Sequence, residues 1–415
     1  MSDGTALRPL YTPMRPRSRD EPHRASTPLE LLFDLCFVVA VAQAAAGLDH
    51  AIIENHVWTG LVQYLMVFFA IWWAWMNFTW FASAYDNDDV AYRLTVLVQI
   101  AGSLVLAAGI PLGFENGGNV VIVIGYVIMR LAMVTQWLRA AASDPQRRVT
   151  NHRYAAGVTI VQLFWLLLLL VPAEIFFIGF VLAVVAELAV PVVAERGVQT
   201  IFHPQHIAER YGLFTVIVLG ESVTAATLAF QSALDETDDR VALICMAIAG
   251  VAILFCMWWI YFDHEAAPRM SSVRATFLWG YGHYVVFAAA AAAGAGLVVA
   301  VSYRRELTEG LGGPVAALAV SAPVAIYVGA IGLLHAHPGR PGIVGWSTGI
   351  AAVVIVADAF VPGSLFLTAA ILAVLVAVLT VATRTLPSRA GSRRSPDRRG
   401  SMSRARRHRN PRPQE

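Results

Sequence analysis

The sequence predicts an all-α protein that crosses a membrane many times, with about twelve transmembrane helices and a disordered basic tail at its C-terminus. Composition is the first reason, because 57% of the 415 residues are hydrophobic, 14% are charged and the mean hydropathy is +0.61. Soluble domains average about 45–50% apolar and about 25% charged residues, so this composition excludes a water-soluble enzyme. The second reason is the recurrence of long apolar segments, and the third is the placement of the arginines.

Twelve segments are long and apolar enough to cross a bilayer. About 20 apolar residues span the hydrocarbon core, and because lipid offers no hydrogen-bond partner, each segment should be a helix. Short turns at Pro172 and Pro362-Gly363 separate two pairs of neighbouring segments. We place the spans at residues 28–48, 57–81, 94–112, 119–138, 154–171, 173–194, 211–233, 241–262, 276–302, 314–335, 343–361 and 364–383.

The arginines predict how these spans are oriented. All 30 basic residues are arginine, and 26 of them lie on one side of the membrane if both termini are cytoplasmic. Three lie on the other side, and Arg130 lies within a span. Since positive residues favour the cytoplasmic side, we predict a multi-pass protein of a bacterial inner membrane with both termini in the cytoplasm.

The chain divides into three regions. Residues 1–26 form a polar cytoplasmic tail without the features of a secretory signal, residues 27–385 form the transmembrane domain, and residues 386–415 form an Arg-rich cytoplasmic tail. Arginine, serine and proline dominate this last region, which therefore cannot form a core. We expect the tail to contact anionic lipid headgroups, and we expect no nucleic-acid binding because no aromatic residue is interleaved with the arginines.

Matching spacings suggest a two-fold repeat, with halves 27–194 and 195–385. Asp34 follows an arginine by ten residues and precedes a tryptophan pair by 38, whereas Glu221 follows an arginine by eleven and precedes a tryptophan pair by 37. Six spans per half would give both halves the same orientation, with the repeat axis along the membrane normal. The alternative is that arginines and tryptophans recur at every membrane interface. We interpret the aromatic residues of 72–81 as such an interfacial belt.

Ionisable residues inside the spans are the candidate functional residues. A mid-membrane charge costs roughly 2.5–3.5 kcal/mol on insertion scales, so it persists where it faces a partner, water or a substrate. Glu30 and Asp34 share one helix face, although Glu30 could simply interact with the helix dipole. Arg130 requires a carboxylate partner, either Asp34 or Glu187, in a pair that is structural or functional. With Glu221, these residues make up a hypothetical pathway for an ion or substrate.

The repeat gives Asp34 and Glu221 matching positions in the two halves. We therefore predict that their carboxylates lie at similar depth and flank one shared cavity near the membrane midplane, where transporters place their sites. The alternative is that each makes an unrelated polar packing contact.

A second candidate cluster precedes the seventh span. His203, His206 and Glu209 recur every third residue, so one helical face could hold a metal ion or relay protons. Pro204 weakens this interpretation, because it places the helix start between the histidines. No cofactor is expected, since the aromatic-rich segment lacks the lysine of a retinal site and the ligand pattern of a haem site.

Several ordered blocks resemble the bacterial low temperature requirement A family over about residues 20–385. They are Thr27-Pro-Leu-Glu30-Leu-Leu-Phe-Asp34, Trp72-Trp-Ala-Trp with the acidic run 86–89 and Arg93, Gly125-Tyr126 leading to Arg130, and His203-Pro-Gln-His206-Ile-Ala-Glu209-Arg-Tyr-Gly-Leu-Phe through Glu221. We expect the acidic run to cap the next helix. The resemblance implies a multi-pass bacterial membrane protein of a family named for growth in the cold, and it implies no defined molecular activity.

With a water-soluble enzyme excluded, three classes of function remain. We expect a secondary transporter or ion permease for a small ion or solute, and not an enzyme. The alternatives are a membrane-embedded, metal- or His/Glu-dependent enzyme acting on lipid, and a sensory or scaffolding protein, for which the chain shows no soluble output domain. The lipid bilayer is the expected partner, and a homo-oligomer is compatible with all three classes.

Overall fold

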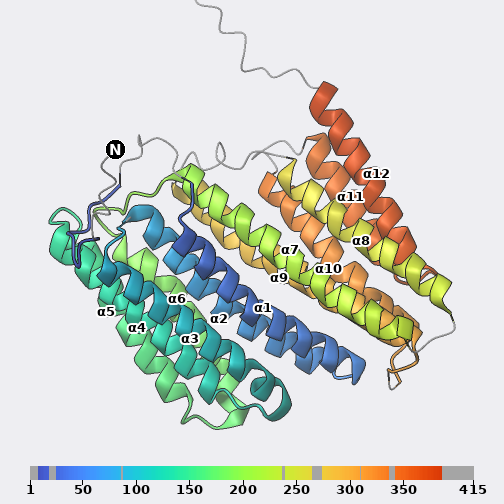
Figure 1. Ribbon diagram of the computed structural model, residues 1–415, viewed down its shortest axis with the longest axis horizontal. Helices are drawn as coiled ribbons and strands as arrows, with labels where there is room; N and C mark the ends of the chain where they lie inside the picture. The colour runs from blue at the N-terminus through green and yellow to red at the C-terminus, as the bar shows by residue number, and fades with distance from the viewer. Residues whose placement is uncertain are drawn as a thin grey trace, which may run out of the picture.

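The computed structural model describes residues 8–17, 25–85, 87–235, 239–263, 273–308, 310–335 and 342–385, and it arranges them as a bundle of twelve α-helices (Figure 1). Each predicted span corresponds to one helix, so the all-α membrane fold and its twelve segments are confirmed. The predicted tail 386–415 lies outside the described residues. The helices are α1 (Pro28–Ile53), α2 (Val57–Ala84), α3 (Val90–Asn116), α4 (Val120–Ser143), α5 (Arg148–Leu168), α6 (Ala173–Ala194), α7 (Pro204–Asp235), α8 (Arg240–Phe262), α9 (Val273–Arg304), α10 (Gly313–His335), α11 (Ile343–Asp358) and α12 (Ser364–Thr385).

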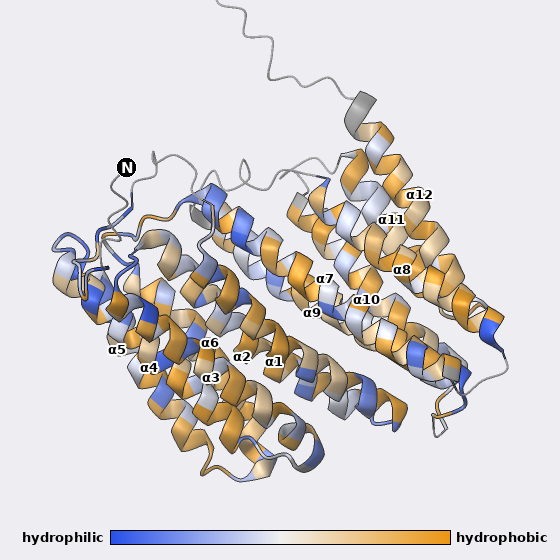
Figure 2. Cartoon of the chain, viewed as in Figure 1, coloured by the Kyte–Doolittle hydropathy of each residue, from blue (hydrophilic) through white to orange (hydrophobic). Residues whose placement is uncertain are grey.

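Ten helices of the described chain are long and apolar enough to cross a membrane. The other two are α11, which has 16 residues, and α5, whose first two turns carry Arg148, Asn151 and Arg153. Figure 2 shows hydrophilic residues gathered at the ends of the bundle and hydrophobic residues over the helix surfaces between them. Such a surface suits a bilayer, and the chain is a multi-pass membrane protein.

The two halves of the chain pack their helices in the same order. In the first half α1 packs on α2 and α3, and α3, α4, α5 and α6 follow one another as neighbours. In the second half α7 packs on α8 and α9, and α9, α10, α11 and α12 follow in the same way. The halves meet where α1 contacts α7 and α9, in the middle of Figure 1. The neighbours of α1 in the first half thus correspond to those of α7 in the second, and the division into 27–194 and 195–385 remains a prediction.

Small residues bring α9 close to its neighbours at the centre of the bundle. A Cβ atom added at Gly296 would lie 2.0 Å from the Ala319 carbonyl oxygen of α10, and one at Gly294 would lie 2.7 Å from the Ser222 hydroxyl of α7. Small side chains of this kind allow the backbones of membrane helices to approach. The contacts on both sides of α9 therefore depend on glycine.

The helix start that Pro204 indicated is confirmed, but the seventh span was predicted to begin too late. The helix begins at Pro204, not at residue 211, so Arg210 lies inside it and is buried. Proline suits the first turn of a helix, and the charged residues that follow it are paired within the protein, which hydropathy does not detect. The predicted placement of Arg210 in a cytoplasmic loop is therefore wrong, although the overall arginine bias survives its removal.

The aromatic residues of α2 lie in the core, so their assignment to an interfacial belt is wrong. Trp73 and Trp75 are completely buried, because α2 packs against α1, α7 and α9. By contrast, Trp258 and Trp259 of α8 are 46% and 45% exposed, on a helix that packs against the peripheral α12. The two tryptophan pairs that suggested the repeat consequently occupy different environments.

The predicted N-terminal tail contributes an ordered segment, residues 8–17, that contacts the connection between α2 and α3. The backbone N–H of Thr12 donates to Asp89 Oδ2 at 2.6 Å, and Arg139 of α4 donates to the same oxygen. Asp89 also caps α3 by accepting from the N–H of Tyr92 at 2.7 Å. Burial would raise the pKa of Asp89, but these donors hold it below its usual value. The predicted capping role is confirmed for Asp89, and Asp86 lies outside the described residues.

Candidate functional site

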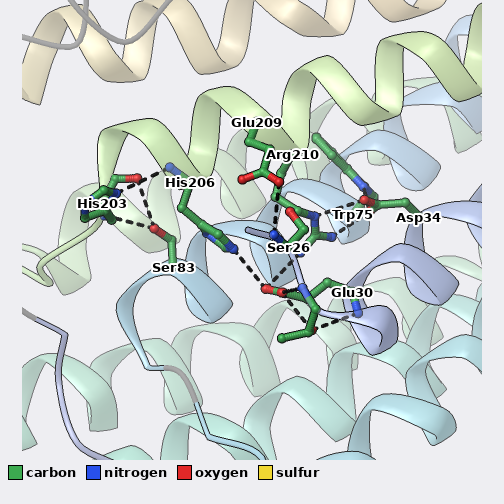
Figure 3. Close-up of polar contacts among 10 residues, drawn as sticks. Ser26, Glu30, Asp34, Trp75, Ser83, His203, His206, Glu209 and Arg210 are labelled. Carbon is green, nitrogen blue, oxygen red and sulfur yellow. Dashed lines mark hydrogen bonds and ion pairs between the residues drawn. The ribbon is translucent and has the colours of Figure 1, made fainter. Parts of the chain in front are cut away.

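A buried ionic network joins α1 to α7 near the N-terminal ends of both helices (Figure 3). Arg210 donates through Nε and Nη2 to the two carboxylate oxygens of Asp34, at 3.0 and 2.6 Å. Its Nη1 lies 3.3 Å from Glu30 Oε1, and His206 Nε2 lies 3.2 Å from the same oxygen. All four residues are at most 2% exposed. A two-pronged, charge-assisted pair of this kind is strong and fixes the relative position of its helices.

Local structure holds the two carboxylates of this network in place. Thr27 and Glu30 form a capping box at the start of α1, in which the N–H and the hydroxyl of Thr27 donate to Glu30 Oε2 at 2.7 and 2.8 Å. Asp34, one turn further along, accepts from the indole N–H of Trp75 at 2.6 Å. The suggested dipole role of Glu30 is thus correct, and its second oxygen remains for His206 and Arg210.

The network contains two carboxylates and one permanent cation. When His206 is neutral the four side chains carry one net negative charge, and a proton added to His206 removes it. Two carboxylates close together in a dry site do not ionise independently, so protons are shared among the members of such a network. The net charge of the network therefore depends on the protonation of its members.

The three residues of the predicted metal or relay face do not converge. His203 lies at the start of α7, where its Nδ1 accepts from the backbone N–H of His206 at 3.4 Å. Glu209 accepts from the N–H of Ser26 at 3.0 Å, whereas His206 turns toward Glu30 (Figure 3). Across the described ranges, no three His, Cys, Asp or Glu side chains are grouped as metal ligands. The metal interpretation is not supported, and only His206 belongs to the ionic network.

Arg130 and Glu187 form a separate network within the first half. Arg130 Nη2 donates to Glu187 Oε2 at 2.8 Å, which confirms the predicted ion pair and selects Glu187 over Asp34. Glu187 is completely buried. It also accepts from four other side chains, Trp73, Tyr126, Gln162 and Trp165, at 2.9, 2.7, 3.2 and 3.3 Å. Five donors from α2, α4 and α5 leave this carboxylate of α6 saturated, and such saturation is typical of a structural anchor.

Glu221 lines a partly open cavity of about 210 Å³ between α1, α7 and α9. The polar residues at its wall are Gln43, Asp49, Glu221 and Ser222, and the remainder are small or apolar. No arginine or histidine lines this cavity. Two carboxylates without a basic neighbour and with room for water between them could hold a proton or a small cation.

The prediction that Asp34 and Glu221 share one cavity is wrong. Arg210 lies level with Asp34, and Glu221 lies eleven residues further along α7, which is about 16 Å at 1.5 Å per residue. The carboxylate of α1 that lines the same cavity as Glu221 is Asp49, fifteen residues beyond Asp34. The spacing aligned Asp34 with Glu221, but in the parallel helices α1 and α7 Asp34 pairs with Arg210, and each of the two lies in the second turn of its helix.

Sequence reasoning missed Asp49, Gln43, Trp73 and Trp75. Asp49 directly follows the predicted end of the first span, so it was assigned to the loop, whereas α1 continues to Ile53. The tryptophans were assigned to the interface because of their residue type. A signal for both existed, since α1 remains apolar after Asp49 and the indoles of Trp73 and Trp75 lie mid-span, where each needs a buried acceptor.

Comparison with known proteins identifies the family of this chain. The model of the bacterial low temperature requirement A protein family matches residues 25–383. An uncharacterized protein of Rhizobium meliloti (strain 1021) is 28% identical over 280 residues, which cover 63% of this chain and 65% of that protein. The chain therefore spans less than two thirds of that relative's length.

Proposed function

The chain belongs to the bacterial low temperature requirement A family, and on that premise we propose that it is a secondary transporter or ion permease whose pathway follows the contact between α1 and α7. One observation carries the proposal: both helices bring ionisable groups to this contact at two levels. At the first level lie Glu30, Asp34, His206 and Arg210, and at the second the cavity with Asp49 and Glu221.

The contact between α1 and α7 is also part of the contact between the halves of the chain. Transporters built from repeats place their sites between the repeats, and they open and close by moving one repeat against the other. Here an ionic network closes the contact at one level, and a cavity without a basic side chain lies about 16 Å further along. In the proposed mechanism, protonation within the network weakens the tie between the halves and admits a cation or proton to the cavity.

Arg130 and Glu187 are left out of this pathway, although both were candidates. Their network joins helices of the first half only, and its carboxylate has no free acceptor position. The alternative of a membrane-embedded enzyme acting on lipid also loses its support, because His203, His206 and Glu209 contact different partners and do not form one site. Location in the inner membrane with both termini in the cytoplasm remains part of the proposal.

Flux through purified protein in proteoliposomes tests the function. Proton, sodium and potassium gradients are imposed separately, and ion movement is followed with a pH-sensitive dye and with ion-selective dyes. We expect flux above that of protein-free vesicles under at least one gradient. Asp49→Asn and Glu221→Gln should each reduce it at least ten-fold, because each removes a charge from the cavity.

Glu174→Gln is the matched control, since Glu174 is an exposed carboxylate at the start of α6. It should retain the flux of the wild-type protein. Size-exclusion chromatography establishes that each variant is folded. A wild-type protein without flux under all three gradients would contradict the proposal, as would a fully active Asp49→Asn/Glu221→Gln double variant.

A further inference from the structure

A second cavity, lined by aromatic rings and one carboxylate, lies away from the proposed pathway. It is formed by α2, α4, α5, α6 and α9 together with the segment that joins α6 to α7, and its volume is about 50 Å³. That volume is room for more than one water molecule, which suits one small chemical group. The cavity lies toward the same end of the bundle as the ionic network, because Trp80 donates to the hydroxyl of Tyr211, next to Arg210, at 3.0 Å.

Aromatic rings from separate parts of the chain form the walls. Trp80 of α2 stacks on Phe277 of α9 with ring centroids 5.2 Å apart and lies 5.1 Å from Phe202 of the α6–α7 connection. On the other side Trp137 of α4 stacks on Tyr154 of α5 at 4.1 Å. Indole, phenol and phenyl rings attract cations through their electron-rich faces. A wall of this composition favours a large, weakly hydrated cation over an anion or a hard metal ion.

Glu195, at the C-terminal end of α6, supplies a negative charge. Its Oε1 accepts from the hydroxyls of Tyr154 and Thr200 at 2.9 and 2.7 Å, and its Oε2 accepts from the N–H of Thr200 at 2.9 Å. All three donors are neutral, and no arginine or histidine is among the residues that line the cavity. The carboxylate is therefore held in place without a counter-ion from the cavity wall.

We infer that this cavity binds the quaternary ammonium group of a small organic cation. The carboxylate supplies the charge, and aromatic cages recognise such groups in general. Three neutral donors already occupy most of the acceptor positions of Glu195, so it attracts a ligand mainly through its negative charge and not through further hydrogen bonds. A cation without N–H donors fits this environment best. This inference concerns ligand binding and not transport, so its test does not depend on the proposed pathway.

Equilibrium binding to the full chain in lipid nanodiscs tests this inference. Tetramethylammonium and choline are titrated, and binding is read from tryptophan fluorescence and from calorimetry. Dimethylbutanol, the uncharged carbon isostere of choline, is the reference ligand. We expect saturable binding of both cations and at least ten-fold weaker binding of the isostere, because the cation–aromatic and carboxylate attractions require the charge.

Two variants locate the site within the protein. Glu195→Gln keeps the acceptor oxygen and removes the charge, so choline binding should weaken about ten-fold, and Phe277→Leu should weaken it about three-fold. Glu174→Gln and Phe366→Leu make the same replacements at exposed positions of α6 and α12 and should bind like the wild type. Unsaturable binding to the folded wild type, or equal affinity for choline and its isostere, overturns the inference, and this comparison decides it even if a variant fails to fold.

Discussion

At the scale of single residues, the number of donors around each carboxylate separates structural from functional candidates. Glu187 accepts from five side chains and has no exposed surface, whereas no basic residue lines the cavity that holds Glu221. A saturated carboxylate is held in one state by its partners, because every change of protonation breaks hydrogen bonds. An unsaturated carboxylate can exchange protons or cations at lower cost. Of these two carboxylates, Glu221 is therefore of greater functional interest than Glu187.

The Arg130–Glu187 pair yields a stability prediction. Arg130→Leu should reduce the yield of folded protein and lower the free energy of unfolding by about 3–5 kcal/mol, because it leaves a buried charge unpaired. Adding Glu187→Gln should recover part of that loss, since the charge is then gone. Thermal unfolding in detergent, read by size-exclusion chromatography, measures both variants, and Arg240→Leu at an exposed position is the control. A single Arg130→Leu variant as stable as the wild type would show that the pair contributes little.

At the scale of helices, close approach between neighbours depends on glycine at a few positions. The two halves pack in the same order, and in both of them glycines lie where two helices are nearest, such as Gly125 between α3 and α4 and Gly296 between α9 and α10. At each, an added Cβ would meet backbone atoms of the partner helix, 2.3 Å away at Gly125 and 2.0 Å away at Gly296. Backbone cannot move aside as a flexible side chain does, so the helices themselves must separate.

Gly296→Ala tests this dependence. The added methyl group would collide with the carbonyl of Ala319, and we expect a loss of about 1–3 kcal/mol in stability, the usual range for overpacking. Gly349→Ala is the matched control, because a Cβ at that position of α11 meets no atom within 4 Å and alanine favours the helix. Relative to the wild type, thermal unfolding should show lower stability for Gly296→Ala and higher stability for Gly349→Ala. Equal stability of Gly296→Ala and Gly349→Ala would mean that α9 and α10 can separate without cost.

At the scale of the whole molecule, the arginine distribution predicts the direction in which the bundle crosses the membrane. A reporter fused after residue 385 should score as cytoplasmic, and one fused after residue 238, between α7 and α8, should score as periplasmic. An alkaline phosphatase and a fluorescent protein, fused in turn at each site, give opposite signals and control for expression. A periplasmic reporter after residue 385 would show that the arginine bias does not set the orientation.

The fold could be predicted almost completely from the sequence, and the candidate site only in part. The twelve helices and the need of Arg130 for a carboxylate partner, either Asp34 or Glu187, follow from hydropathy and the cost of an unpaired charge, and the structure selects Glu187. The partner of Asp34, the cavity neighbour of Glu221 and the burial of the α2 tryptophans do not follow. Each depends on which face of one helix meets another helix, and a one-dimensional pattern does not contain that register.

The sequence by itself therefore determined that this chain is a membrane protein, where its helices lie and which ionisable residues should not face lipid. These properties are local, because they follow from the transfer of one segment at a time from water into hydrocarbon. Only the tertiary structure decided that α1 and α7 run parallel with Asp34 paired to Arg210, and that Asp49 rather than Asp34 lines the cavity with Glu221. The physical reason is that a charge inside the bilayer must find some partner, and the packing of α1 against α7 and α9 selects which one.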